Sequence, residues 1–179
     1  IPHNSRQWKR AIINDISIDI DRLQQVSDRF SKMGSETKLE ETHLSNVVEN
    51  IVLYFNRRLP TMGKSVVINN KLDSNIKISA NGILISWAIE NVVKNAIDAL
   101  ENDGVITLKT KKDKKNTIIQ IEDSGKGIPR GDWKNIFRPG FSTKEQGWGL
   151  GLSLALRIIN EIHNGSIYVF QSEQDKGTI

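Results

Sequence analysis

The chain has 179 residues, of which 37% are hydrophobic and 26% charged. This balance favours one packed domain with a helical extension and excludes a wholly disordered chain. Cysteine is absent, which excludes disulfides, thiolate zinc sites and cysteine nucleophiles. The apolar runs are shorter than the roughly 18 residues that a membrane helix needs. The net charge of +4 could suit a polyphosphate ligand or a nucleic acid, but the excess is small. Charge is the only feature that points to nucleic-acid binding. The chain begins with isoleucine, and we expect it to be a piece of a longer protein.

The first segment, residues 5–33, lacks proline and glycine and carries apolar residues at spacings of three, four and seven. This pattern predicts a long amphipathic helix with a near-heptad seam. The seam could pack on its own domain, or its partner could be a helix upstream or in a second copy of the chain. We favour the second alternative, because the chain offers no long partner helix nearby. Residues 1–40 are therefore assigned to an extension and residues 41–179 to the main domain.

The remaining chain alternates between helical and strand patterns after a polar break at residues 34–42. Helices are expected at 44–58, 81–100 and 150–162, and strands at 65–72, 74–79, 105–112, 116–123 and 166–172. The strands at 105–112 and 116–123 form a hairpin across a lysine-rich turn, and the strands as a group look antiparallel. Helices mixed with such strands predict an α+β fold, with helices on one face of a sheet.

The helix at 81–100 carries a polar row beside a wide apolar stripe. Asn91, Asn95 and Asp98 are spaced by four and three, so they lie along one edge of the helix. The row could simply face water. However, asparagine is a middling helix former, and oxygen atoms of this kind are ligands that Mg²⁺ accepts. The row therefore also suits the wall of a binding cleft.

Asp123 ends the strand at 116–123 and lies in phase with an apolar row that includes Ile119 and Ile121. A carboxylate at the inward end of such a row is costly unless donors satisfy it. Asp123 could cap the turn that follows. Alternatively, the exocyclic amine of a purine could donate to it, and Gly125 and Gly127 would let backbone or ligand approach closely.

Gly147, Gly149 and Gly151 alternate just before the helix at 150–162. A glycine-rich loop that enters a helix N-terminus can cradle phosphates, and Thr143 and Lys144 could add a hydroxyl and a cation. Any flexible glycine loop would look similar, so this pattern alone is weak.

Two common phosphate-binding loops are excluded. The GKS at residues 63–65 resembles the end of a Walker A loop, but Arg58 stands where that motif needs its first glycine. The sequence GKGIPRG carries Arg130 at the third glycine position of the dinucleotide-binding motif.

In this order the segments resemble the ATP-binding domain of sensor histidine kinases, a branch of the superfamily that includes gyrase, Hsp90 and MutL. ENVVKNAIDAL is similar to the N box, EDSGKGIP to the first glycine box, NIFRPGFSTK to the F box and GWGLGLSLA to the second glycine box. HNGSIYVFQSEQDKGTI resembles the closing strand and glycine–threonine element. The resemblance runs from about residue 43 to the end. It implies a two-layer α/β sandwich of the Bergerat type, which holds ATP and Mg²⁺ between helices and a mobile lid.

The resemblance also implies roles for individual residues. Asn95 would bind Mg²⁺ with Asn91 and Asp98 beside it, and Asp123 would accept a hydrogen bond from adenine. Gly125 and Gly127 would shape the adenine pocket, and Thr178 would lie near Asp123. The lid would include Phe137, Phe141 and Lys144. The phosphates would be wrapped by Gly147, Gly149, Leu150, Gly151 and Leu152.

Two departures from the family pattern refine the expected function. Hydrolases of the superfamily carry a glutamate four residues before the metal-binding asparagine. Here that residue is Asn91, and the neighbouring Glu90 points about 100° away around the helix. None of His3, His43 and His163 has the sequence context of the acceptor histidine.

We therefore expect a catalytic domain that transfers the γ-phosphoryl group of ATP to a histidine outside this chain. Residues 1–40 would supply the second helix of a dimerisation hairpin. The expected partners are a response-regulator receiver domain and the protein's own dimerisation helices in a homodimer, but no nucleic acid. The expected location is the cytoplasmic part of a sensor that is anchored in the membrane by segments upstream. Three alternatives stay open: an ATPase of the MutL, Hsp90 or gyrase type, a non-enzymatic module with a degenerate pocket, and a nucleic-acid binder.

Overall fold

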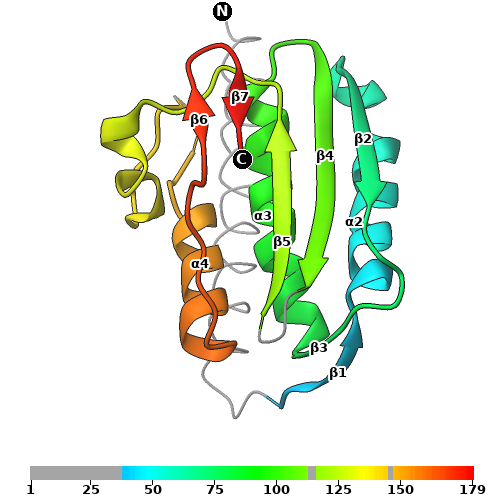
Figure 1. Cartoon of the computed structure of the whole chain (residues 1–179). Helices are drawn as coiled ribbons and strands as arrows, with labels where there is room; N and C mark the ends of the chain where they lie inside the picture. Colours follow the sequence, from blue (N-terminus) through cyan, green and yellow to red (C-terminus); the bar gives the residue numbers. More distant parts are fainter. Residues whose placement is uncertain (1–37, 113–115, 145–146) are drawn as a thin grey trace, which may run out of the picture. The chain divides into compact units, whose positions relative to one another are not determined.

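A computed structural model describes residues 38–112, 116–144 and 147–179 (Figure 1). They belong to one compact unit, which spans residues 38–179. The helix expected at residues 5–33, with its role in dimerisation, lies outside the described residues. The proposed boundary near residue 41 stays a prediction. Within the described ranges, no helix has the length and apolarity to cross a bilayer.

The described unit is a two-layer α+β sandwich. One layer is a five-stranded sheet with the order β2-β4-β5-β7-β6. The other contains α2 and α3, which lie side by side behind the sheet (Figure 1). The elements of the sheet are β2 (Ser65–Lys71), β4 (Asp103–Lys112), β5 (Thr117–Asp123), β6 (Ser172–Glu173) and β7 (Gly177–Thr178), and the two helices are α2 (Leu44–Arg58) and α3 (Gly82–Ala99). The expected fold class is therefore confirmed.

The core lies between the two layers. The apolar faces that the helical period predicts on α2 and α3 are the ones that the structure buries, against the inward side chains of β2 and β4. Ile106 and Leu108 of β4 are fully buried, whereas Val67 and Val105 on the opposite face of the sheet are 55% and 43% exposed. Among the described residues, helices therefore cover only one face of the sheet.

The sheet is mixed, so the expectation of antiparallel strands is wrong for one pair. β2 pairs with β4 in parallel, with Ser65 opposite Asp103. β4 and β5 form the expected antiparallel hairpin, in which Ile106 lies opposite Asp123. Between β2 and β4 the chain leaves the sheet, runs through α3 and re-enters in the same direction, which is the kind of crossover that a parallel pair requires.

Several element boundaries differ from the predicted ones. The polar segment at 34–42 was expected to be a break, but Glu40–His43 forms strand β1. β1 pairs with β3 (Lys77–Ala80) in a separate two-stranded sheet. Of the strand expected at 166–172, only the last residue, Ser172, lies in a strand, β6. Backbone hydrogen bonds nevertheless join Phe170 and Gln171 to Ile179.

The helix expected at 150–162 is divided in two. α4 (Gly151–Arg157) is α-helical, and Ile158–Ile162 continues it as a π-helical turn, η4. Three single 3₁₀ turns complete the described part of the chain: η1 (Pro60–Met62), η2 (Arg130–Asp132) and η3 (Asn135–Phe137).

Candidate nucleotide-binding site

The polar row predicted on α3 forms one edge of that helix. The helix begins where Asn81 caps it, with Oδ1 accepting from the Leu84 amide at 3.1 Å. Asn91, Asn95 and Asp98 are all partly exposed beside the buried stripe. The amide nitrogen of Asn95 donates to the Asn91 carbonyl at 2.8 Å, and that of Asn91 donates to the Trp87 carbonyl. Both carboxamides thus donate to their own helix, which leaves the Asn95 oxygen to face outward.

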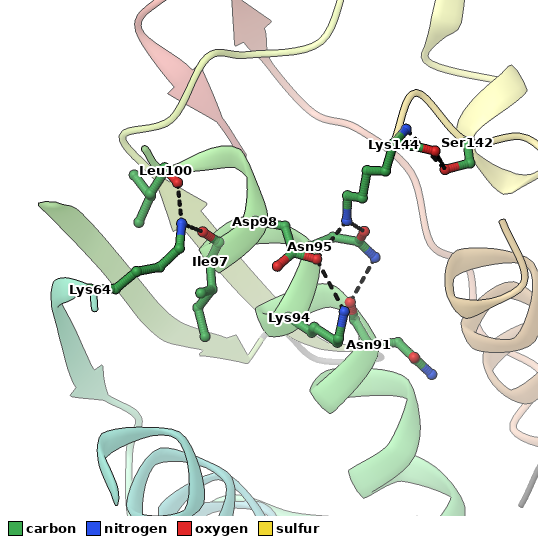
Figure 2. Close-up of polar contacts among 9 residues, drawn as sticks. All are labelled: Lys64, Asn91, Lys94, Asn95, Ile97, Asp98, Leu100, Ser142 and Lys144. Atoms are coloured by element: carbon green, nitrogen blue, oxygen red, sulfur yellow. Dashed lines mark hydrogen bonds and ion pairs between the residues drawn. The ribbon is translucent and has the colours of Figure 1, made fainter. Parts of the chain in front are cut away.

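Lys144 comes from the segment before the glycine loop and lies on this row (Figure 2). Its Nζ donates to Asn95 Oδ1 at 2.9 Å and to Asp98 Oδ2 at 2.6 Å. Lys94 also contacts Asp98, at 3.1 Å. Burial acts to raise the pKa of Asp98, but the hydrogen bond and charge of Lys144, with help from Lys94, outweigh it and hold this pKa below its ordinary value. The carboxylate of Asp98 is therefore ionised.

The position of the Lys144 ammonium also indicates whether this polar row can bind a metal ion. A cation already bridges one amide oxygen and one carboxylate oxygen, which are hard ligands of the kind that Mg²⁺ takes. Within the described ranges, no group of three or more histidine, cysteine or acidic residues could hold a metal by itself. The donor set therefore fits a Mg²⁺ ion that obtains its other ligands from phosphates and water.

Asp123 lies at the end of β5, where the sequence places it, and is partly buried. Its Oδ1 accepts a hydrogen bond from the Gly125 amide at 2.8 Å. Burial raises the pKa of Asp123, while hydrogen bonds from the backbone amides of Gly125 and Thr178 act in the opposite direction. The two amides offset only part of the desolvation cost, so a further donor would stabilise the carboxylate.

The glycines after Asp123 allow close backbone packing. A Cβ on Gly125 would lie 2.7 Å from the carbonyl oxygen of Ala99 in α3. The Ala99 carbonyl accepts from the amide of the next residue, Lys126, at 3.1 Å. Gly127 has φ +73°, and a Cβ there would overlap the carbonyl of Glu173. This loop is therefore fitted tightly between the end of α3 and the β6–β7 hairpin.

The final hairpin contributes residues that the sequence analysis missed. Thr178 lies opposite Asp123 in the sheet, as expected. Ser172 Oγ lies 2.9 Å from Thr178 Oγ1 and accepts from the Ile128 amide at 2.7 Å. Gly177 has φ +93°, and a Cβ there would overlap the carbonyl of Asp123. The glycine was visible in the closing KGTI, but Ser172 had no signal beyond its place in a strand pattern.

The second glycine box packs on α3 and on the F-box segment. A Cβ on Gly151 would lie 3.0 Å from Asn91 Oδ1, so the start of α4 lies beside the polar row. Gly149 has φ +62° and its carbonyl accepts from the Gly140 amide at 3.1 Å. A Cβ on Gly147 would lie 3.1 Å from Ser142 Oγ. The loop thus has close neighbours at three positions, and a backbone hydrogen bond fixes one of them.

The remaining residues that were predicted to wrap the phosphates or to form the lid lie at the start of α4 and in the segment before it. Leu150 precedes α4, and its carbonyl accepts from the Leu154 amide and the Ser153 hydroxyl, both at 2.9 Å. Leu152 lies in the first turn of α4 and is partly buried, as are Phe137 of η3 and Phe141. Their roles toward a nucleotide stay predictions.

Two residues that the sequence analysis considered for phosphate binding or for phosphoryl acceptance, Lys64 and His163, instead make structural hydrogen bonds. Lys64, from the GKS that resembles a Walker A loop, donates through Nζ to the carbonyls of Ile97 (3.0 Å) and Leu100 at the end of α3 (Figure 2). It also donates to the carbonyl of Glu101 at 2.9 Å. His163 Nε2 accepts from the Asn81 amide at 3.1 Å, and Nδ1 lies 2.8 Å from the Ile158 carbonyl. Both ring nitrogens of His163 are thus engaged, and His43 ends β1 on the surface.

Together, the fold and this site define a two-layer nucleotide-binding domain. The family model of histidine kinase-, DNA gyrase B- and HSP90-like ATPases matches residues 80–179, more than half of the chain. The chain belongs to this family.

The relatives place the chain in the histidine-kinase branch. Sporulation kinase C of Bacillus subtilis is 42% identical over 89 residues, which are 50% of this chain and 20% of that protein. Sensor histidine kinase ZraS of Escherichia coli is 29% identical over 167 residues, which are 87% of this chain and 35% of that protein. The chain thus spans about a fifth to about a third of these relatives.

Solved structures agree with this assignment. The catalytic domain of histidine kinase ThkA is 26% identical, with a TM-score of 0.68 over 79% of this chain and 91% of that one. The histidine kinase ThkA in complex with the response regulator TrrA is 22% identical, with a TM-score of 0.72 over 99% of this chain and 50% of that one. The chain therefore contains an ATP-binding domain of the histidine-kinase type.

Proposed function

We propose that this domain binds ATP with Mg²⁺ and that the intact protein transfers the γ-phosphoryl group to a histidine outside this chain. The observation that carries the proposal is Asp123, a partly buried carboxylate whose desolvation is only partly offset by the amides of Gly125 and Thr178. The amine of adenine would supply the remaining donor.

The polar row of α3 would hold the metal end of the nucleotide. Asn95 Oδ1 would be a ligand of Mg²⁺, with Asn91 and Asp98 beside it, since Lys144 already places a cation on Asn95 and Asp98. When bound, Mg²⁺ supplies neutralisation of the phosphate charge. The glycine loop before α4 would lie over the phosphates, because Gly151 lies against Asn91.

Asn91 favours transfer over hydrolysis. It stands where the hydrolases of the family carry a glutamate base, and a carboxamide cannot accept a proton at neutral pH. Its Nδ2 donates to the Trp87 carbonyl, which turns this group back onto the helix. Activation of water is therefore weak, and phosphoryl transfer rests on positioning and on charge stabilisation.

The partners follow from the same proposal. ThkA was solved with a response regulator, and a receiver domain would accept the phosphoryl group here too. The intact protein would be a homodimer through a helical hairpin, to which the helix predicted within residues 1–40 would contribute the second helix. Its kinase portion would lie in the cytoplasm, with any membrane anchor upstream.

Calorimetry on Asp123→Ala tests the adenine site. Loss of a hydrogen bond to a charged group costs about 1.5–3 kcal/mol, so ATP affinity should fall roughly tenfold to 150-fold. Asp103→Ala is the matched control, because Asp103 is an exposed aspartate at the start of β4. An equal affinity of Asp123→Ala and the parent chain would remove Asp123 from the site.

The reaction itself is tested on the intact protein with ATP labelled in the γ-phosphate. Label that stays on the protein in alkali and is lost in acid would identify phosphohistidine. Rapid phosphate release without labelled protein would instead favour the ATPase alternative.

A further inference from the structure

One hollow is lined by residues to which no role in ATP binding is assigned. It has a volume of about 450 Å³ and lies between the η2–η3 segment and the extended segment before β6. Its lining includes three cations, two aromatic rings and one carboxamide, namely Arg130, Lys134, Arg138, Trp133, Tyr168 and Asn135. The volume falls within the range of about 300–1,000 Å³ that is typical of ligand sites.

One wall of this hollow is ordered by its own contacts. Trp133 Nε1 donates to the Ile128 carbonyl at 3.0 Å, which fixes the indole ring. The Arg130 guanidinium lies 5.7 Å from the centre of that ring, within the range of a cation–π contact. Asn135 donates to the Gly131 carbonyl at 3.2 Å and to Asp132 at 3.3 Å. The wall is therefore formed before any ligand arrives.

The cations of the hollow have no acidic partner in the described part of the chain. Seven other basic residues there form ion pairs, but Arg130, Lys134 and Arg138 form none. Tyr168 faces them from the opposite segment and is 64% exposed. Three uncompensated charges next to an exposed ring attract an anion that also offers apolar surface.

We propose that this hollow binds an acidic segment of a partner protein, with at least two carboxylates that reach Arg130, Lys134 and Arg138. Three separate cations in one lining suit several carboxylates better than one phosphate, and the described lining carries no glycine-rich helix start that would cradle a phosphate. Arginine accepts carboxylates in a bidentate geometry, and Tyr168 would pack on the stems of the acidic side chains.

A nucleic acid fits these observations less well. Single strands bind by stacking bases on exposed aromatic rings along a basic groove. In this hollow, Arg130 already covers a face of Trp133, and the charge is confined to one depression. Binding of an oligonucleotide is therefore an outcome of the test that would contradict the proposal.

The test measures fluorescence anisotropy of a labelled hexaglutamate peptide titrated with the full chain. The double variant Lys134→Glu/Arg138→Glu should weaken binding about tenfold or more, because like charges then face the peptide. The matched control is Lys71→Glu/Lys112→Glu, which makes the same charge change at exposed ends of β2 and β4 and should change the affinity less than about threefold. Arg138→Gln removes one positive charge without introducing a negative one. It is used in place of the double variant if the double variant misfolds.

Three results would overturn the proposal. These are no binding of hexaglutamate, equal losses in the hollow and control variants, and tighter binding of a hexathymidylate strand than of the peptide. ATP affinity should be unchanged in Lys134→Glu alone, because Lys134 is exposed and precedes the F-box segment. A negative result for peptide binding would therefore leave the proposed nucleotide site unaffected, because that site is tested separately by Asp123→Ala.

Discussion

Replacement of Lys64 distinguishes a structural lysine from a phosphate-binding one. In the sequence, the GKS at residues 63–65 resembles the end of a Walker A loop, whose lysine contacts phosphates. In the structure, the Lys64 ammonium instead donates to three carbonyls at the end of α3. Lys64→Met keeps the length of the side chain and removes the charge and all three hydrogen bonds.

The expected loss of stability follows from these contacts. A partly buried cation at a helix C-terminus contributes up to about 2 kcal/mol. The freed carbonyls can turn partly to water, so we expect a loss of about 2 kcal/mol in the free energy of unfolding. In a domain of this size, about 1 kcal/mol corresponds to about 2–4 °C, which predicts a fall in Tm of about 4–8 °C.

The assay is thermal unfolding followed by circular dichroism, with ATP affinity measured in parallel by calorimetry. Lys71→Met is the control, because Lys71 is exposed at the end of β2 and should leave Tm within about 1 °C. A Lys64→Met variant with the parent Tm and a large loss of ATP affinity would refute the capping role and restore the phosphate-binding interpretation.

Two further predictions concern the carboxylates of the site. Because burial raises the pKa of Asp123, its carboxyl group is half protonated at a pH above the ordinary aspartate value of about 3.9. An NMR titration should therefore show that the affinity for adenosine, which has no phosphate, falls before the pH reaches that value. Constant affinity down to about 3.9 would contradict this. For Asp98 the pKa is lowered, so its pair with Lys144 stabilises the fold above the unfolded pKa of about 3.9 and loses this effect as the pH falls through the lower folded value. Lys144→Ala should lower the free energy of unfolding in urea by about 0.5–1 kcal/mol at pH 7 and should have no effect well below the folded pKa of Asp98. Lys94→Ala is the milder control, since Lys94 is 63% exposed. An equal loss of stability at both pH values would exclude the ion pair as its cause.

Periodicity predicted the two main helices well, because their burial depends on residues three and four apart. The stripe from Ile85 to Ile97 and the row from Asn91 to Asp98 both lie where the helical repeat places them. The β4–β5 hairpin was equally visible, since its strands are neighbours in the chain. Alternation also placed Asp123 in phase with Ile119 and Ile121, which pack on the core.

The features that sequence reasoning missed depend on long-range pairing. Nothing local in the polar segment 40–43 indicates a strand, because its order comes from pairing with β3 nearly forty residues later. The parallel direction of β2 is likewise set by the crossover through α3. Lys64 and Ser172 act through hydrogen bonds to distant backbone groups, and such contacts leave no periodic signature in the sequence.

The helical segment formed by α4 and η4 contacts α3 at both ends of the segment. Gly151 abuts Asn91 at one end, and the His163 imidazole, just after η4, bonds the first residue before α3 at the other. The segment formed by α4 and η4 is thus joined to α3 by a close glycine contact at its start and by an imidazole hydrogen bond just after its end. The imidazole of His163 therefore contributes to the register of α4 and η4 against α3, in addition to accepting from the backbone at the start of α3.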